Sequence, residues 1–209
     1  MSQVLVASNR GPVSFSLSED GALTMRRGGG GLVSGLAAVT GAPRDPGPPR
    51  PAGATVSPGT GSTATGAAGT GAEPPADDPD VLWVCASLGE GDRTAARRSP
   101  DGRIDLTGYE TGGAAVRMLD IPEATFQRAY NAVANSTLWF VHHLLYDTPR
   151  SPHFDARARR DWQSYEAYNA AFADALARDA AQGAKAAIQD YHLSLAPRML
   201  RERRPDLKI

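Results

Sequence analysis

The sequence contains a single cysteine and no long hydrophobic run among its 209 residues, and each shortage excludes a class of protein. A lone Cys85 cannot form an internal disulfide, and its place in the apolar segment 81–86 predicts a buried, unreactive thiol. No segment approaches the roughly 18 consecutive apolar residues of a membrane span. The N-terminus also lacks the basic and then apolar pattern of a secretion signal. We therefore expect a cytoplasmic protein that has no membrane partner.

An excess of charge is missing as well, because 22 Lys and Arg residues balance 23 Asp and Glu residues. Domains that bind nucleic acid usually carry a marked basic patch, so we expect no nucleic-acid partner. The sequence has no G-x-S-x-G motif, and Cys85 has no identifiable base partner. The adjacent His142 and His143 would point apart on a helix, so they would not chelate one ion. We expect neither a nucleophilic hydrolase nor a metal or other cofactor.

What the sequence does contain is an alternation of apolar segments and helical patterns. Its length suits one domain. Strands are predicted at 4–7, 81–86, 115–119 and 185–190, with a hairpin at 13–25. An irregular helix is predicted from Pro122, and a long helix over 156–181, with Trp162 on its apolar face, is expected to end at Gly183. The polar segment 89–113 shows no clear element. This order favours an α/β fold with a Rossmann-like, mostly parallel sheet and flanking helices.

Residues 42–80 interrupt this alternation, because they consist mostly of Pro, Gly, Ala, Thr and Ser. Such a segment buries too little apolar surface to offset the entropy lost on ordering. We expect a disordered, low-complexity insertion within one domain, since an apolar strand resumes at 81–86.

Four glycines at 28–31 run directly into apolar residues with helical spacing, Leu32, Leu36 and Val39. Backbone N–H groups at such a turn are unpaired and carry the positive end of the helix dipole, which suits a phosphate. The run fits neither the G-x-G-x-x-G motif nor the P-loop motif. From these residues alone, a flexible linker and an anion-binding loop remain equally open.

Polar side chains follow the predicted strands, where ligands bind in open α/β sheets. Arg10 follows the first strand, and Asp190 ends the last one with His192 nearby. Together with Tyr130 and Trp139 of the middle helix, these residues are typical of a sugar-phosphate pocket. Arg and Tyr would hold a phosphate, a carboxylate would accept from sugar hydroxyls, and an aromatic ring would cover the sugar. An ordinary surface arginine and core aromatics are the alternative for each residue taken separately.

Four motifs in their order along the chain resemble the trehalose-6-phosphate synthases, which are retaining glycosyltransferases of family 20, and especially their actinobacterial members. The motifs are VASNR at 6–10, GGGLVSGL at 29–36, YNAVANSTLW at 130–139 and QDYHL at 189–193. The resemblance implies the GT-B architecture, in which two Rossmann-like domains enclose the active site. It also implies transfer of glucose from UDP-glucose or GDP-glucose to glucose 6-phosphate, without a metal, which gives trehalose 6-phosphate.

The resemblance implies a role for each matching site residue. Arg10 and Tyr130 match acceptor-phosphate ligands, and Trp139 and Asp190 match acceptor-sugar contacts. Asp190 would orient the acceptor and would not act as a covalent nucleophile, since retention in this family is assigned to front-face attack.

The glycine loop has a counterpart in the same family. Gly30 and Gly31 match the loop whose amides lie near the donor diphosphate.

The sequence departs from the family at two places. Ala86 stands where the family commonly has tryptophan, which alters one wall of the sugar site. The chain also ends at Ile209, so we expect residues 1–209 to form a truncated N-terminal acceptor-binding domain without the C-terminal nucleotide-sugar-binding domain. Such a chain would supply only the acceptor half-site and would be inactive alone. A homo-oligomer is possible.

Two alternatives to this interpretation remain open. One is a non-catalytic sugar-phosphate-binding or regulatory fragment. The other is a related synthase or pseudo-glycosyltransferase with another acceptor, which the alanine at position 86 suggests.

Overall fold

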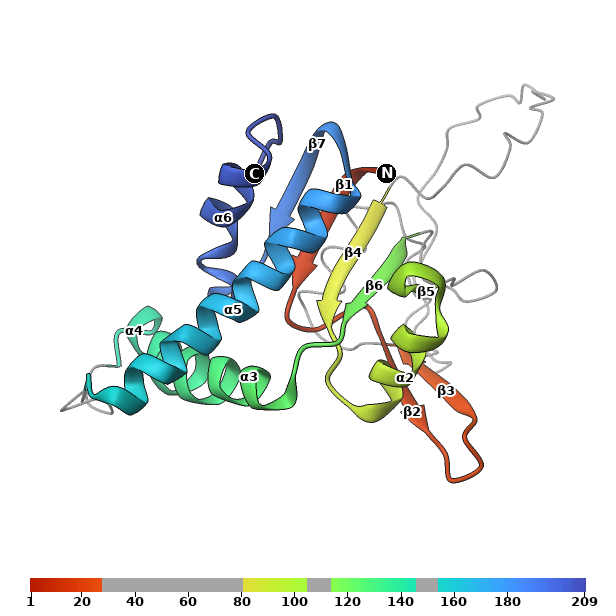
Figure 1. The fold of residues 1–209 in the computed structure, drawn as a ribbon, viewed down its shortest axis with the longest axis horizontal. Helices are drawn as coiled ribbons and strands as arrows, with labels where there is room; N and C mark the ends of the chain where they lie inside the picture. The colour runs from red at the N-terminus through yellow and green to blue at the C-terminus, as the bar shows by residue number, and fades with distance from the viewer. Residues whose placement is uncertain (28–80, 105–113, 146–153) are drawn as a thin grey trace, which may run out of the picture.

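A five-stranded sheet with the order β5-β6-β4-β1-β7 organises the chain (Figure 1). The computed structural model describes residues 1–27, 81–104, 114–145 and 154–209. The four parallel strands are β1 (Ser2–Ser8), β4 (Val81–Ala86), β6 (Ala115–Leu119) and β7 (Ala180–Ile188), and β5 (Arg103–Ile104) pairs antiparallel with β6 at the edge. The expected insertion at 42–80 and the glycine loop, with Gly30 and Gly31, lie outside the described residues. The expected mostly parallel, Rossmann-like sheet is confirmed.

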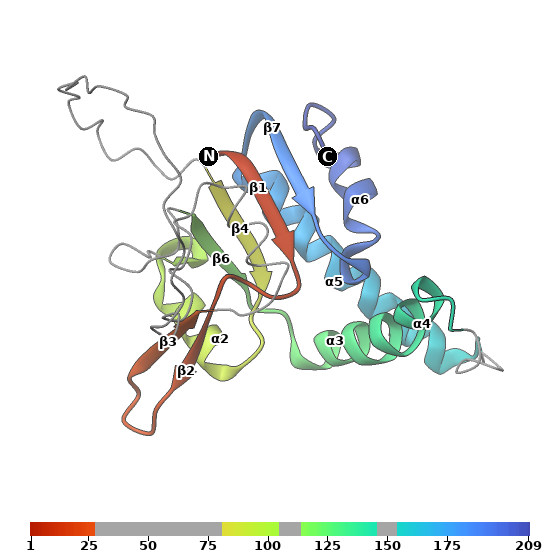
Figure 2. The ribbon, with the colours of Figure 1, turned by 180° about the vertical axis from the view of Figure 1, so that it is seen from behind.

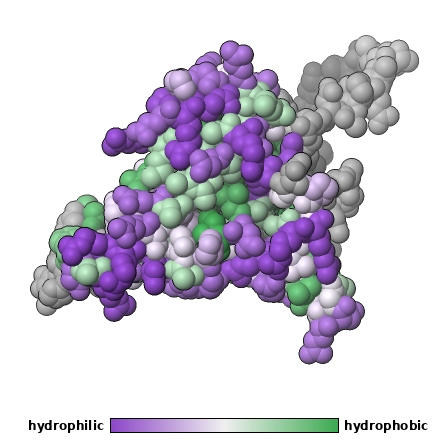
Figure 3. All heavy atoms as spheres, in the orientation of Figure 1, coloured by the Kyte–Doolittle hydropathy of each residue, from purple (hydrophilic) through white to green (hydrophobic). Residues whose placement is uncertain are grey.

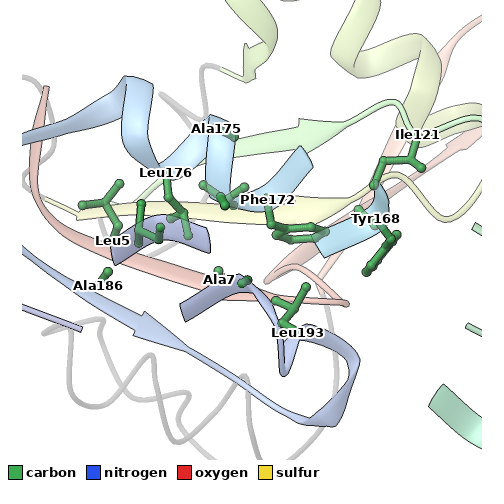
Figure 4. Close-up of a cluster of buried hydrophobic side chains, with 14 of the residues drawn as sticks. Leu5, Ala7, Ile121, Tyr168, Phe172, Ala175, Leu176, Ala186 and Leu193 are labelled. Atoms are coloured by element: carbon green, nitrogen blue, oxygen red, sulfur yellow. The ribbon is translucent and has the colours of Figure 1, made fainter. Parts of the chain in front are cut away.

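Residues along β1 and β4 alternate between the two faces of the sheet, as strand geometry requires. Leu5 and Ala7 of β1 pack into one hydrophobic cluster, together with Phe172 and Leu176 of a long helix (Figure 4). Val6, which lies between them, packs into a second cluster on the other face. The central strands are therefore buried on both sides, which explains why they appear in the sequence as continuous apolar runs.

Helices cover the first of these faces. They are α3 (Glu123–Gln127), η2 (Arg128–Leu138), α5 (Ala156–Asp179), η3 (Tyr191–Leu193) and α6 (Ala196–Arg203), whereas α4 (Trp139–His142) continues from η2 and buries none of its residues. The long helix α5 crosses in front of the strands in Figure 1, and the view from behind in Figure 2 places the strands in front of it. The α4 end of the molecule exposes hydrophobic side chains (Figure 3), among them Val141 and Leu144.

The opposite face of the sheet is covered by α2 (Glu90–Arg98) and, beside it, the hairpin of β2 (Val13–Leu17) and β3 (Leu23–Arg27). The hairpin confirms the prediction for 13–25. It is held by Asp92, whose carboxylate accepts from the backbone N–H of Phe15 (2.6 Å) and of Leu88 (2.9 Å). Gly91 allows this contact, since a Cβ there would lie 2.1 Å from the Phe15 carbonyl oxygen.

The sequence pattern indicated no clear element over 89–113, but α2, η1 (Pro100–Gly102) and β5 lie within the described part of that segment. The helix buries only small side chains, chiefly Ala95 and Ala96, so it leaves no large apolar stripe in the sequence. The charged residues at its two ends nevertheless stabilise helix α2. Acidic residues occupy the first turn and arginines the last, and both arrangements favour the helix dipole.

The irregularity expected in the helix after Pro122 is confirmed, because η2 is a π-type helix between two α-helical turns. Such wide turns occur frequently at functional sites. Near the C-terminus, a single parallel bridge joins Lys185 and Lys208.

The predicted end of the long helix at Gly183 was wrong. Helix α5 ends at Asp179, and β7 begins at the next residue and contains Gly183 at a φ of 70°. The last carbonyls of α5 need no glycine cap, because the guanidinium of Arg204 donates to the carbonyls of Ala177 (2.8 Å) and Ala180 (3.0 Å).

The predicted apolar face of α5 is confirmed at Tyr165, Phe172 and Leu176, which are fully buried. It is wrong at Trp162, which is 41% exposed and donates from its indole N–H to Glu166 (3.0 Å). Trp162 lies in the second turn of α5, toward the end of the helix that extends past the sheet (Figure 1).

Candidate functional site

The carboxyl edge of the sheet brings together the polar residues that follow β1 and β7. These strands pair in parallel, and Gln189 N–H donates to the Ala7 carbonyl (2.8 Å) just where they end. Arg10 and Asp190 therefore follow neighbouring strands at one edge. The chain from α3 to α4 runs below the ends of the strands in Figure 1 and supplies the aromatic residues.

Asp190 has an unusual backbone, with φ of 76° and ψ of 158°, a region that L-residues rarely adopt. Such strain is concentrated at functional sites, where surrounding contacts enforce it. Its Oδ1 accepts from the backbone N–H of Tyr191 (2.7 Å), and its Oδ2 lies 3.1 Å from His192 Nδ1. The side chain is 38% exposed, so lone pairs on both oxygens remain free for a hydroxyl donor.

His192 connects Asp190 to the aromatic residues. Its ring stacks with Tyr130 (centroids 5.2 Å apart) and with Tyr191 (4.3 Å). Burial lowers the pKa of His192, and the nearby charge of Arg10 lowers it further, whereas Asp190 acts in the opposite direction. The imidazole is therefore neutral at neutral pH.

Helix α5 forms the support behind this edge. The hydroxyl of Tyr168 donates to Asn9 Oδ1 (2.6 Å), and the hydroxyl of Tyr165 donates to the carbonyl of Tyr191 (2.5 Å). The segment that carries Asp190 and the segment that carries Arg10 are thus both bonded to the same rigid helix.

Trp139 lies nine residues beyond Tyr130, and its ring stacks on His143 of its own helix (4.3 Å). The neighbouring His142 lies 5.9 Å from the Tyr191 ring. The structure thus brings Arg10, Tyr130 and Asp190 together, and it places Trp139 further along the helical segment that carries Tyr130.

Ala86 ends β4 and is 2% exposed, in the same hydrophobic cluster as Phe126 and Tyr168. It lies next to the strand end that bears Arg10, since Ala86 N–H donates to the Asn9 carbonyl (3.3 Å). A small residue stands at the position for which the family resemblance implies an indole ring.

The sequence did not identify Asn169 as part of this site. It is fully buried, and its Nδ2 donates to the carbonyls of Tyr165 (2.9 Å) and His192 (3.3 Å). Its Oδ1 accepts from the N–H groups of Leu195 and Ala196, both at 3.1 Å. The available signal was an amide on the apolar face of an amphipathic helix, because a buried amide requires partners.

Cys85 is fully buried, as expected, and burial raises the pKa of its thiol, to which the charge of Asp92 contributes. Within the described residues, no group of three or more His, Cys, Asp or Glu side chains is arranged to hold a metal ion. No helix in that part of the chain has the length and apolar character needed to cross a membrane.

We expect the folded chain to lose stability as the pH falls, over a pH range that the pKa of His192 determines. Because its pKa is lower in the folded chain than its ordinary 6.5, the unfolded chain binds the proton first as the pH drops. This stabilising contribution is complete above about pH 6.5 and is lost as the pH falls toward the folded pKa of His192. Thermal melting of the wild type and of His192→Asn between about pH 7.5 and 5 tests this. Equal slopes for the two chains would contradict it.

Comparison with known proteins gives one matching family and several similar enzymes. The model of glycosyltransferase family 20 matches residues 93–209. A trehalose-6-phosphate synthase of Mycobacterium sp. (strain JLS) is 38% identical over 111 residues, which are 53% of this chain and 21% of that protein. A validamine 7-phosphate valienyltransferase of Streptomyces hygroscopicus subsp. jinggangensis is 29% identical over 132 residues, or 62% of this chain and 26% of that protein.

Solved structures give the same fold. The α,α-trehalose-phosphate synthase (UDP-forming) of Burkholderia vietnamiensis superposes with a TM-score of 0.53 at 21% identity, covering 97% of this chain and 31% of that one. The chain thus spans about a quarter of the length of the curated relatives and about a third of the solved one.

Proposed function

Because this chain belongs to glycosyltransferase family 20, we propose that its described residues form the acceptor-binding part of a retaining glucosyltransferase. The reaction is transfer of glucose from a nucleotide-glucose, UDP-glucose or GDP-glucose, to glucose 6-phosphate, which gives trehalose 6-phosphate. The names of the mycobacterial relative, a trehalose-6-phosphate synthase, and of the UDP-forming Burkholderia enzyme support this choice. The observation that carries it is that Arg10 and Asp190 follow neighbouring parallel strands at one edge of the sheet, where Tyr130 stacks on His192 beside Asp190.

These residues suit a phosphorylated sugar. Arg10 is exposed and offers a planar fork of N–H donors, which fits two oxygens of a phosphate. Tyr130 adds a hydroxyl on the neighbouring helix. Asp190 accepts from a sugar hydroxyl and so orients it toward the donor, a contribution of positioning that needs no covalent bond to the enzyme. Trp139 would cover the sugar ring from the same helical segment.

The proposal for this chain concerns the acceptor half-site, and the donor contacts expected of Gly30 and Gly31 remain predictions. The chain corresponds to about a third of the solved synthase. We propose that residues 1–209 supply the acceptor half-site of a GT-B enzyme.

A second candidate is a related transferase with a different phosphorylated acceptor. The validamine 7-phosphate valienyltransferase matches 62% of this chain, against 53% for the mycobacterial synthase. Ala86 favours this candidate, because loss of a large ring beside the strand end that bears Arg10 changes the space open to the acceptor. The two candidates share the phosphate contact and differ at the ring of the acceptor.

Isothermal titration of the chain with glucose 6-phosphate tests the proposal. We expect binding by the wild type and a loss of roughly 10- to 150-fold in Arg10→Ala, since a charge-assisted hydrogen bond is worth about 1.5–3 kcal/mol. Arg10→Lys keeps the charge but loses the planar pair of N–H donors. Its affinity for glucose 6-phosphate should therefore lie between those of the wild type and Arg10→Ala.

Titrations with glucose and with validamine 7-phosphate are the controls. Glucose lacks the phosphate and should bind more weakly to the wild type by a similar factor. Equal affinity of wild type and Arg10→Ala for glucose 6-phosphate would overturn the acceptor assignment. Tighter binding of validamine 7-phosphate than of glucose 6-phosphate would favour the second candidate.

A further inference from the structure

We propose that His192 is a positioning residue, which donates from Nδ1–H to Asp190 and so fixes the carboxylate that receives the acceptor hydroxyl. The inference rests on the proposed function, since it concerns the same acceptor site. His192 acts through Asp190 and need not touch the acceptor itself.

Asp190 needs such a partner because of where it stands. It follows the end of β7 in a strained backbone conformation and is partly exposed, so its carboxylate is not held by packing. Two hydrogen bonds fix it, one on each oxygen: Tyr191 N–H to Oδ1 (2.7 Å) and His192 Nδ1 to Oδ2 (3.1 Å). A carboxylate ordered before binding loses less entropy when the acceptor arrives. The first of these bonds is made by the backbone, so only the second can be removed by a side-chain substitution.

The imidazole itself is held rigidly. The side chain of His192 is 8% exposed, and its ring stacks with Tyr130 on η2 and with Tyr191 on its own segment. Its backbone carbonyl accepts from Asn169 on α5. Because the imidazole is fixed, its Nδ1–H holds the carboxylate of Asp190 in one orientation.

The surroundings also fix which nitrogen carries the proton. Nε2 is buried and has no hydrogen-bond partner among the residues that the structure describes, so a proton there would be an unsatisfied buried donor. The charged and titratable groups near the ring are Arg10 after β1, Tyr130 on η2, and Asp190 and Tyr191 beside it. The neutral ring with its hydrogen on Nδ1 satisfies Asp190 and leaves Nε2 as a bare acceptor.

Three substitutions separate this role from a structural one. The amide nitrogen of His192→Asn takes the position of Nδ1, that of His192→Gln takes the position of Nε2, and His192→Phe keeps the stacked ring without a donor. In titrations with glucose 6-phosphate, we expect His192→Asn to stay close to the wild type. The Gln and Phe variants should bind about tenfold more weakly, the value of one hydrogen bond to a charged group.

The Asp190→Asn background and the tautomer of the ring provide two further measurements. In Asp190→Asn, His192→Phe should cause no further loss, because the carboxylate that it positions is absent. Two-bond ¹H–¹⁵N NMR spectra at neutral pH should show the neutral Nδ1–H form, and circular dichroism melts should show that each variant folds.

The outcomes distinguish the two proposals. If the wild type does not bind glucose 6-phosphate, the proposed function fails and this role fails with it. If the wild type binds and Arg10→Ala loses affinity, but all three His192 variants bind equally well, only the positioning role is overturned. A ring protonated at Nε2 would also overturn it.

Discussion

Replacement of Asn169 by leucine is expected to lower the free energy of unfolding by roughly 2–6 kcal/mol. Helix α6 has no capping side chain of its own, and Asn169 Oδ1 accepts the N–H groups of Leu195 and Ala196 at its start instead. Leucine has a similar volume and leaves both donors without a partner, at about 1–3 kcal/mol each. Urea denaturation monitored by circular dichroism measures the change.

The same substitution should also weaken binding at the proposed acceptor site. Asn169 ties the carbonyl of His192 to α5, so its loss frees the segment that carries Asp190. A matched control is Gln163→Leu, which makes the same kind of change on the exposed face of α5 and should stay within about 0.5 kcal/mol of the wild type. Equal effects of the two substitutions would show that Asn169 does not cap α6.

Replacement of Arg117 by methionine is expected to destabilise the chain by about 3–5 kcal/mol, the usual cost of breaking a buried ion pair by removing one partner. Arg117 on β6 and Asp179 at the end of α5 have side chains that are 5% and 11% exposed. The guanidinium donates through Nε (2.5 Å) and Nη2 (3.1 Å) to the two carboxylate oxygens. Without Arg117, the charge of Asp179 remains desolvated at the junction between α5 and the sheet.

Two controls test this explanation. Arg178→Met removes an exposed arginine beside the same carboxylate (3.6 Å) and should cost less than about 1 kcal/mol. The double variant Arg117→Met, Asp179→Leu removes both buried charges and should recover most of the lost stability. A double variant that is as unstable as Arg117→Met alone would mean that the loss comes from packing. Urea denaturation of all four chains provides the comparison.

The sequence by itself determined the strands and the family. Continuous apolar runs mark strands that are buried on both faces, and they predicted β1, β4 and β6 because this burial is a property of each segment alone. The order of these segments indicated a parallel sheet, which the structure confirms. The motifs at 6–10, 130–139 and 189–193 indicated family 20, which the match over 93–209 confirms.

The sequence pattern did not correctly predict elements whose stability depends on residues far away in the chain. Helix α2 buries only small residues and docks through Asp92 on a hairpin that lies far away in the chain. The end of α5 depends on Arg204, more than twenty residues further on, so the local glycine rule gave the wrong residue. Trp162 fits the apolar period of α5, yet the helix extends past the sheet there and the side chain is 41% exposed.

The sequence predicted one part of the candidate site, and the tertiary structure decided the other part. Residue types alone indicated that Arg10, Tyr130 and Asp190 suit a sugar phosphate. Only the tertiary structure decided that they meet, because β1 and β7 pair in parallel across most of the length of the chain. It also decided the roles of Asn169 and His192, since a hydrogen bond depends on positions in space that the spacing of residues along a chain does not encode.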